Sequence, residues 1–107
     1  MELVEQSEIQ GIVERIVKHY DPDKIILFGS YAQGTATPES DVDFLIIKDS
    51  QLPRYQRGIE VRRYLYDALV PMDILVYTNA EIEEYRNVKS SFVNTVLHSG
   101  RILYARN

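Results

Sequence analysis

Three short apolar segments constrain the fold more than any other feature of the sequence. They are KIILFG at residues 24–29, DVDFLIIK at 41–48 and MDILVY at 72–77. Runs of this length, rich in branched side chains, are typical of strands that are covered by other parts of a chain. We therefore predict three strands, and we expect the first to be buried on both faces of its sheet.

The segments around the first two strands have helical features. Apolar residues recur at steps of three and four over residues 4–20, and DPD at 21–23 ends this amphipathic pattern. Residues 30–40 form a connection, with room for one helical turn. A second long helix is predicted over 54–69. We expect four of its residues to face the sheet: Tyr55, Ile59, Tyr66 and Leu69.

The C-terminal third of the chain predicts two short helices and one more strand. The first helix begins at Asn79 as its cap, and the second spans residues 90–99 and is ended by Gly100 in the C′ role. RILYA at 101–105 is expected to form an edge strand. With 107 residues, the chain has the size of one domain. The predicted class is α/β, a small mixed sheet with helices packed on it, in a single domain over 1–107.

Charge and composition exclude several classes of protein. The 12 Lys and Arg against 16 Asp and Glu give a net charge of −4, which argues against direct nucleic-acid binding. The absence of cysteine excludes disulfides and thiolate chemistry. The N-terminal residues lack the pattern of a signal peptide, and no apolar run approaches the ~20 residues that span a bilayer. We expect a cytoplasmic protein without membrane contact.

Three aspartates stand where the pattern calls for buried strands. Asp41 and Asp43 are two residues apart, so their side chains project to one side of the second strand. Asp73 lies in the otherwise apolar third strand, and it can reach the same point if the two strands are neighbours. Two carboxylates ~4 Å apart repel by about 4 kcal/mol at an effective dielectric of about 20, and a divalent cation would offset this. Three carboxylates at one point can hold two Mg²⁺ ions for phosphoryl displacement.

The first strand ends in Gly29-Ser30, a turn suited to phosphate. Glycine permits close backbone approach, and the following N–H groups and the Ser30 hydroxyl can donate to phosphate oxygens. Each feature also has a structural interpretation. Gly-Ser can be a plain turn, Asp-x-Asp a solvated strand end or helix cap, and Asp73 the partner of Arg62 or Arg63. Together, the three features make the structural interpretations the weaker account.

One basic stretch stands apart from these features. Residues 54–63, RYQRGIEVRR, hold four of the twelve basic residues and a tyrosine. The stretch is interpreted as a solvated helix face, with an acidic partner or nucleic acid as the alternative contact.

The motif residues resemble the nucleotidyltransferase superfamily of the DNA polymerase β type. Its signature is Gly-Ser, ten residues and Asp-x-Asp, which Gly29-Ser30, residues 31–40 and Asp41-Val42-Asp43 match. Over nearly the whole chain the sequence is most similar to the minimal nucleotidyltransferases (MNT), antitoxins encoded beside HEPN-domain toxins. One departure is Gln33, where many relatives have an arginine. Its loss of charge could weaken triphosphate binding or alter nucleotide choice.

The resemblance implies a role for each motif residue. Gly29 and Ser30 would hold the triphosphate of ATP, and Asp41, Asp43 and Asp73 would bind Mg²⁺, with Asp73 also the general base. The implied reaction is Mg²⁺-dependent transfer of AMP to a hydroxyl of a protein, namely a partner HEPN ribonuclease toxin, which makes the chain its antitoxin. The alternative is an antitoxin that neutralises the toxin by binding alone. A homo-oligomer and a hetero-oligomer are both compatible with this resemblance.

Overall fold

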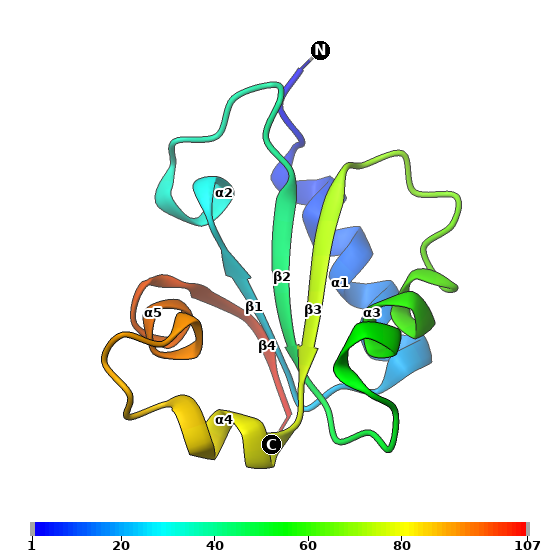
Figure 1. The fold of residues 1–107 in the computed structure, drawn as a ribbon. Helices are drawn as coiled ribbons and strands as arrows, with labels where there is room; N and C mark the ends of the chain where they lie inside the picture. Colours follow the sequence, from blue (N-terminus) through cyan, green and yellow to red (C-terminus); the bar gives the residue numbers. More distant parts are fainter. Residues whose placement is uncertain (1, 107) are drawn as a thin grey trace.

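A four-stranded sheet with the strand order β3-β2-β1-β4 forms the centre of the computed structural model, which describes residues 2–106 (Figure 1). The strands are β1 (Lys24–Phe28), β2 (Val42–Ile47), β3 (Met72–Tyr77) and β4 (Arg101–Ala105). The helices are α1 (Gln6–Tyr20), α2 (Ser30–Gln33), α3 (Arg54–Arg62), α4 (Asn79–Tyr85) and α5 (Phe92–Ser99). All three predicted strands are present, and RILYA forms the predicted edge strand.

The sheet is mixed, as the sequence predicted. Strand β1 pairs antiparallel with both β2 and β4, whereas β2 and β3 are parallel. A parallel pair needs a crossover between its strands, and α3 lies in that connection. The connection from β1 to β2 contains the predicted helical turn, α2. Strand β3 therefore lies at one edge of the sheet and β4 at the other.

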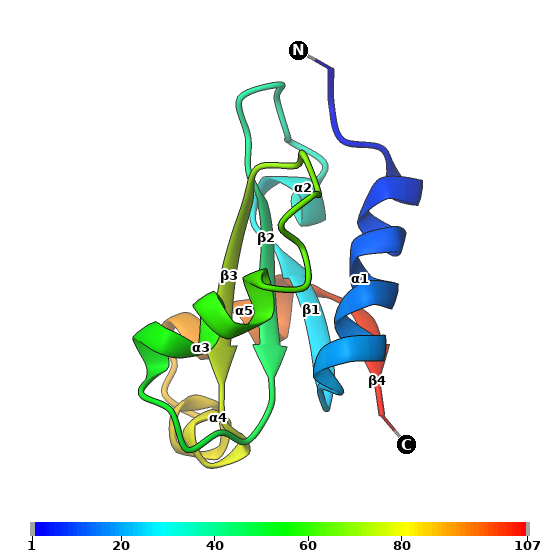
Figure 2. The ribbon, with the colours of Figure 1, turned by 90° about the vertical axis from the view of Figure 1, so that its right-hand side faces the viewer.

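Helices cover both faces of the sheet. On one face, α1 and the residues of α3 pack on alternate strand residues such as Ile25, Phe44 and Val76. On the other, α4 and α5 pack on residues that include Ile26 and Leu45. Figure 1 shows these helices on opposite sides of the sheet, and Figure 2 shows α1 lying along it. Strand β1 is buried on both faces, which confirms the prediction.

Helix ends follow local chemistry, with two differences from the predicted caps. The cap of α4 is Thr78 and not Asn79, because the Thr78 side chain accepts from the Glu81 N–H (3.2 Å) and Glu81 accepts from the Thr78 N–H (2.8 Å). Gly100 ends α5, but with a φ of −78° and not in the left-handed conformation. A Cβ at Gly100 would lie 2.6 Å from Ile26 Cγ2, so close packing explains this glycine. Within residues 2–106, no helix has the length and apolar character needed to cross a membrane.

Helix α3 turns a different face inward from the predicted one. It ends at Arg62, and the four residues expected to face the sheet, Tyr55, Ile59, Tyr66 and Leu69, are 58% to 96% exposed. The buried residues are Arg57, Val61 and, beyond the helix, Leu65. A Cβ at Gly58 would lie 2.9 Å from the carbonyl oxygen of Ile74, so the helix meets β3 at its glycine. That contact sets the helix rotation and exposes the apolar stripe.

Candidate active site

The strand register brings the motif residues to one corner of the sheet. Asp43 pairs with Phe28 on β1 and with Asp73 on β3. Because paired residues on neighbouring strands share a face, Asp43 and Asp73 project to the same side, which is the side of α5. The end of β1 and the starts of β2 and β3 meet at the top of Figure 1, next to α2.

Backbone hydrogen bonds fix the starts of the two strands that carry the aspartates. The Val42 N–H donates to the Pro71 carbonyl at 2.9 Å, which ties the start of β2 to the residue before β3. In the loop before Asp41, the Ser40 hydroxyl accepts from the Thr37 N–H at 2.9 Å. These contacts therefore fix the backbone that carries the aspartates.

Gly29 is required by both its conformation and its surroundings. Its φ is +74° and its ψ −156°, a region that is essentially restricted to glycine. A Cβ atom at this position would overlap Asp43 Oδ2. The Gly29 carbonyl accepts from the Ala32 and Gln33 N–H groups, both at 3.1 Å, and so closes the α2 turn. The turn after β1 and the carboxylate of Asp43 therefore lie in direct contact, as expected if both belong to one site.

Ser30 and Gln33 are the two polar side chains of this turn. Ser30 is half-buried. Gln33 Nε2 donates to the Ser99 carbonyl at the end of α5, at 3.1 Å. Gln33 thus connects the turn to α5.

Asp43 is the electrostatic centre of the corner. Its pKa lies above its ordinary value because of burial first, then the charge of Asp73, then that of Asp41. The shift means that the negative charge of Asp43 is disfavoured where it stands. A cation would reverse that preference, because a positive ion favours the charged form of a carboxylate.

Asp73 is exposed, and the prediction that it lies embedded in the sheet core is wrong. It occupies the second position of β3, and β3 is an edge strand, so water reaches its side chain. Asp41 is also exposed, whereas Asp43 between them is half-buried. The suggested partner Arg62 instead donates to the Met72 carbonyl at 3.1 Å.

The carboxylates fit a divalent cation by their chemistry and by their backbone positions. Asp41, Asp43 and Asp73 supply the hard oxygen ligands that Mg²⁺ prefers. Within residues 2–106, no set of three or more His, Cys, Asp or Glu side chains is gathered as a metal site. The strand register thus brings the backbone positions of these aspartates together as predicted, but their carboxylate groups do not converge on one point. Like charges repel, and the two exposed aspartates have room to turn away from Asp43.

A charged cluster that was not predicted from the sequence lies at the opposite end of β3 from this corner (Figure 1). Arg57 is 7% exposed and donates to the Leu52 and Val76 carbonyls (2.9 and 3.2 Å) and to Glu81 Oε1 (2.7 Å). Glu81 also lies 3.4 Å from Arg54, which stacks over the Tyr77 ring. No spacing rule links residues 24 positions apart, so the sequence alone gives no signal for the pair.

Comparisons with known sequences agree on one family. The profile described as nucleotidyltransferase domain matches residues 7–101. A protein of Methanocaldococcus jannaschii, named as a candidate protein adenylyltransferase, is 41% identical over 104 residues, which cover 94% of this chain and 98% of the relative. A second protein of that organism, with the same kind of name, is 32% identical over 101 residues and is covered to 97%.

Solved structures share the fold. A candidate nucleotidyltransferase from Sulfolobus solfataricus superposes with a TM-score of 0.65 and 19% identity, over 94% of this chain and 79% of that one. A chain of a toxin–antitoxin crystallised with AMP-PNP gives a TM-score of 0.61 and 23% identity, over 92% and 74%. These similarities confirm the predicted nucleotidyltransferase fold.

Proposed function

Because the chain belongs to the nucleotidyltransferase domain family, we propose that it transfers AMP from ATP to a hydroxyl group of a protein. The observation that carries the proposal is the register that sets Asp43 between the Gly29 turn and Asp73. The names of the relatives, candidate protein adenylyltransferases, support a protein as the acceptor. In this proposal residues 1–107 act as one nucleotidyltransferase domain.

The turn after β1 binds the triphosphate. Gly29 has no side chain, so phosphate oxygens can come close to the backbone. The N–H groups that follow it, together with the Ser30 hydroxyl, donate hydrogen bonds to those oxygens. Gln33 holds the turn against α5 through the Ser99 carbonyl.

Asp41, Asp43 and Asp73 are the residues that would hold Mg²⁺, in the proposal as two ions. When bound, Mg²⁺ neutralises the triphosphate and stabilises the charge that develops at phosphorus. Asp43 is central, since Gly29 on one side and Asp73 on the other touch or neighbour it. The site therefore needs both a phosphate turn and carboxylates at one corner of the sheet.

Asp73 orients the acceptor hydroxyl and takes its proton. The hydroxyl oxygen attacks the α-phosphorus of ATP, and the bond from that phosphorus to the bridging oxygen breaks. Pyrophosphate leaves with the electron pair of that bond, and the proton goes to Asp73. The exposure of Asp73 suits this role, because a large acceptor must reach it from solvent.

The proposed acceptor is a toxin of the HEPN ribonuclease class, and its adenylylation makes this chain an antitoxin in the cytoplasm. The toxin–antitoxin structure with AMP-PNP supports the pairing of this fold with a toxin and a nucleotide. Antitoxin action by binding alone is the second candidate, and the exposed apolar residues of α3 favour a protein contact of some kind.

Labelled ATP, Mg²⁺ and the HEPN-class protein encoded beside this chain test the proposal. We expect label on the acceptor, and none with EDTA or with the Asp41→Ala/Asp43→Ala variant. Complex formation, measured by gel filtration, should survive in that variant. Neutralisation of the toxin by a variant that cannot transfer label would instead establish action by binding alone.

A further inference from the structure

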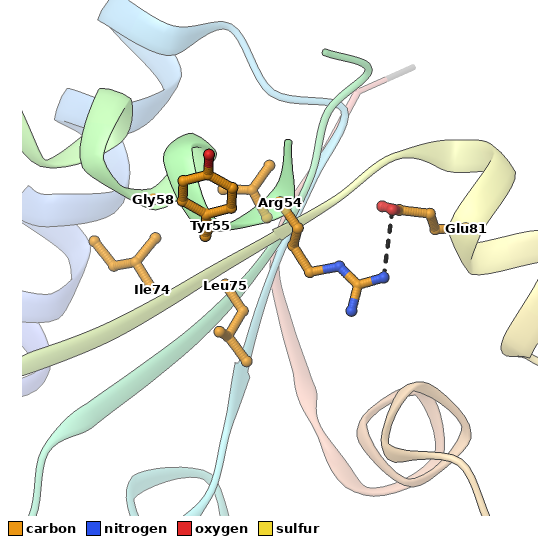
Figure 3. Close-up of a pocket in the computed structure, with 7 residues that line it drawn as sticks. Arg54, Tyr55, Gly58, Ile74, Leu75 and Glu81 are labelled. Atoms are coloured by element: carbon orange, nitrogen blue, oxygen red, sulfur yellow. Dashed lines mark hydrogen bonds and ion pairs between the residues drawn. The ribbon is translucent and has the colours of Figure 1, made fainter. Parts of the chain in front are cut away.

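A hollow of about 460 Å³ lies along the outer side of β3, next to the candidate site. Its lining includes Arg54, Tyr55, Gly58, Ile74, Leu75 and Glu81, and we call it the acceptor groove (Figure 3). Figure 3 shows Arg54 extending toward Glu81, and their nitrogen and oxygen are 3.4 Å apart.

The acceptor groove begins at the residue after the proposed general base. Ile74 and Leu75 directly follow Asp73 on β3, and both line the groove. Leu75 projects to the same side of the sheet as Asp73, because residues two apart share a face. A chain segment in the groove would therefore lie beside the point where the acceptor hydroxyl is needed.

The outer edge of β3 is blocked against an added strand. Arg62 donates to the Met72 carbonyl at 3.1 Å, and Arg57 donates to the Val76 carbonyl at 3.2 Å. Between them, the Ile74 carbonyl lies against Gly58. Three successive outward carbonyls of the edge are thus covered by α3, so strand addition is disfavoured there. A partner must be recognised by side chains.

Exposed apolar side chains stand at the rim of the acceptor groove. Tyr55 is 74% exposed and Ile59, one turn later on α3, is 58% exposed. Tyr55 also lines a second hollow of about 470 Å³, on its other side, together with Ile59 and Arg63. An exposed aromatic between two hollows has the properties of a residue that anchors a protein interface.

The charge of this surface selects among possible partners. Helix α3 and the residue after it carry four arginines and one glutamate, on a chain with a net charge of −4. Glu81 pairs with Arg57 and, at 3.4 Å, with Arg54, and Arg62 and Arg63 are exposed beside them. A second copy would bring the same basic surface against itself, which is unfavourable. Ile59 and Glu60 argue against a nucleic acid, which binds basic and aromatic surfaces.

We propose that the acceptor groove and its Tyr55–Ile59 rim bind the acceptor protein through a segment with apolar and acidic side chains. The segment carries, or lies beside, the hydroxyl that receives AMP at Asp73, so the inference rests on the proposed function. The groove thereby determines which protein is modified. The corner with Gly29, Asp41, Asp43 and Asp73, which we call the nucleotide corner, determines the chemistry.

Steady-state transfer to the HEPN-class protein encoded beside this chain tests the proposal with Tyr55→Ser, Ile59→Ser and Arg63→Glu. We expect the KM for the acceptor to rise about tenfold or more with Tyr55→Ser, as for an interface anchor. The KM for ATP and kcat at saturating acceptor should stay at the parental values. Arg63→Glu should raise the KM for the acceptor most at low salt, because charge complementarity is screened by salt.

Ile102→Ser is the matched control, because Ile102 is 60% exposed on β4, at the opposite edge of the sheet. Its KM for the acceptor should equal the parental value. Equal KM values for Tyr55→Ser, Ile59→Ser and the parent, with transfer intact, would show that the groove does not bind the acceptor protein. Absence of transfer by the parent would instead overturn the proposed function, and binding to the acceptor in EDTA would then test the groove by itself.

Two further measurements address other occupants of the groove. Light scattering of the parent and Tyr55→Ser over a range of concentrations should give equal masses, whereas a parental dimer lost in the variant would assign the groove to a second copy. A labelled single-stranded RNA 20-mer should bind weakly and equally to both proteins. RNA binding that Tyr55→Ser abolishes would likewise contradict an acidic protein partner.

Discussion

The nucleotide corner and the acceptor groove lie next to each other on β3, but they depart from a stable globule in opposite ways. At the corner, Asp41, Asp43 and Asp73 occupy neighbouring positions, and burial and the charges of the other two carboxylates raise the pKa of Asp43. Along the groove, Tyr55 and Ile59 expose apolar surface that a core could have used. Within residues 2–106, neither the negative charge of the corner nor the exposed apolar surface of the groove is matched by a partner.

The two regions need different partners from outside the chain. Repelling carboxylates are relieved by cations, so the corner is suited to Mg²⁺ and triphosphate. Exposed aromatic and aliphatic side chains beside arginines are relieved by another protein surface. Changes at the corner should therefore affect chemistry and leave acceptor binding intact, and changes along α3 should do the reverse.

The largest effect is expected for Asp73→Asn. Transfer should fall about 10²–10⁴-fold, as for loss of a general base, because asparagine cannot accept the proton. Since Asp73 is exposed, the melting temperature without metal should stay equal or rise as repulsion with Asp43 is relieved. Single-turnover transfer in Mg²⁺ and a thermal melt in EDTA measure both. Parental transfer by this variant would remove Asp73 from the site, and Glu14→Gln on the exposed side of α1 is the control.

Arg57→Met should be the most damaging change to folding on the α3 side. It leaves Glu81 without its closest cation and removes bonds to two backbone carbonyls. Loss of one partner of a buried pair costs about 3–5 kcal/mol, and we expect the lower end because Glu81 is partly exposed. Urea unfolding measures the change. Arg62→Met, which removes one bond at the surface, should lose no more than about 1.5 kcal/mol; equal losses for both would refute the role of burial.

Ser30→Ala should weaken ATP binding about 10- to 100-fold, because a hydrogen bond to a charged group is worth about 1.5–3 kcal/mol. Stability should be unchanged, since the hydroxyl of a turn residue contributes to the ligand more than to the core. Calorimetry with ATP and Mg²⁺ measures the affinity. An unchanged dissociation constant would mean that the turn after β1 does not hold phosphate.

The smallest effect is a pH dependence of stability that comes from Glu81. Burial raises the pKa of Glu81, but hydrogen bonds from Thr78 and Arg57 and the nearby arginine charges bring it below its ordinary 4.5. A lowered pKa in the folded state stabilises the fold above the unfolded pKa, and this contribution is lost as the pH falls through the folded pKa. The free energy of unfolding, measured with urea from pH 6 down to about pH 3, should therefore fall less steeply for Glu81→Gln than for the parent. In an Arg57→Met background the difference should shrink, and a persisting difference would exclude Arg57 as its cause.

Much of the corner could be predicted because its constraints lie close together in the chain. The ten residues from Gly29-Ser30 to Asp41, and the two-residue step to Asp43, indicate the chemistry without knowledge of the fold. The prediction for Asp73 rested on the assumption that its strand neighbours the strand of Asp43. The parallel pairing of β2 and β3 confirms this. Its exposure was missed because the sequence does not show that β3 lies at an edge.

The orientation of α3 could not be predicted, because it depends on a contact between distant residues. Apolar periodicity favoured Tyr55 and Ile59 as the inner face, but Gly58 permits the close approach to Ile74 that turns Arg57 inward. An arginine on the inner face contradicts a hydrophobic pattern unless its partner, Glu81, is known. The same contact leaves the apolar stripe exposed and so creates the groove surface.

Asp43→Asn is the decisive variant, because burial and two neighbouring carboxylates raise the pKa of Asp43. We propose that the carboxylates of the corner are kept for transfer at the expense of stability. In EDTA the variant should melt at or above the parental temperature, and in Mg²⁺ it should transfer no detectable AMP to the acceptor protein. A variant that melts well below the parent in EDTA, or that transfers AMP at the parental rate, would contradict the account.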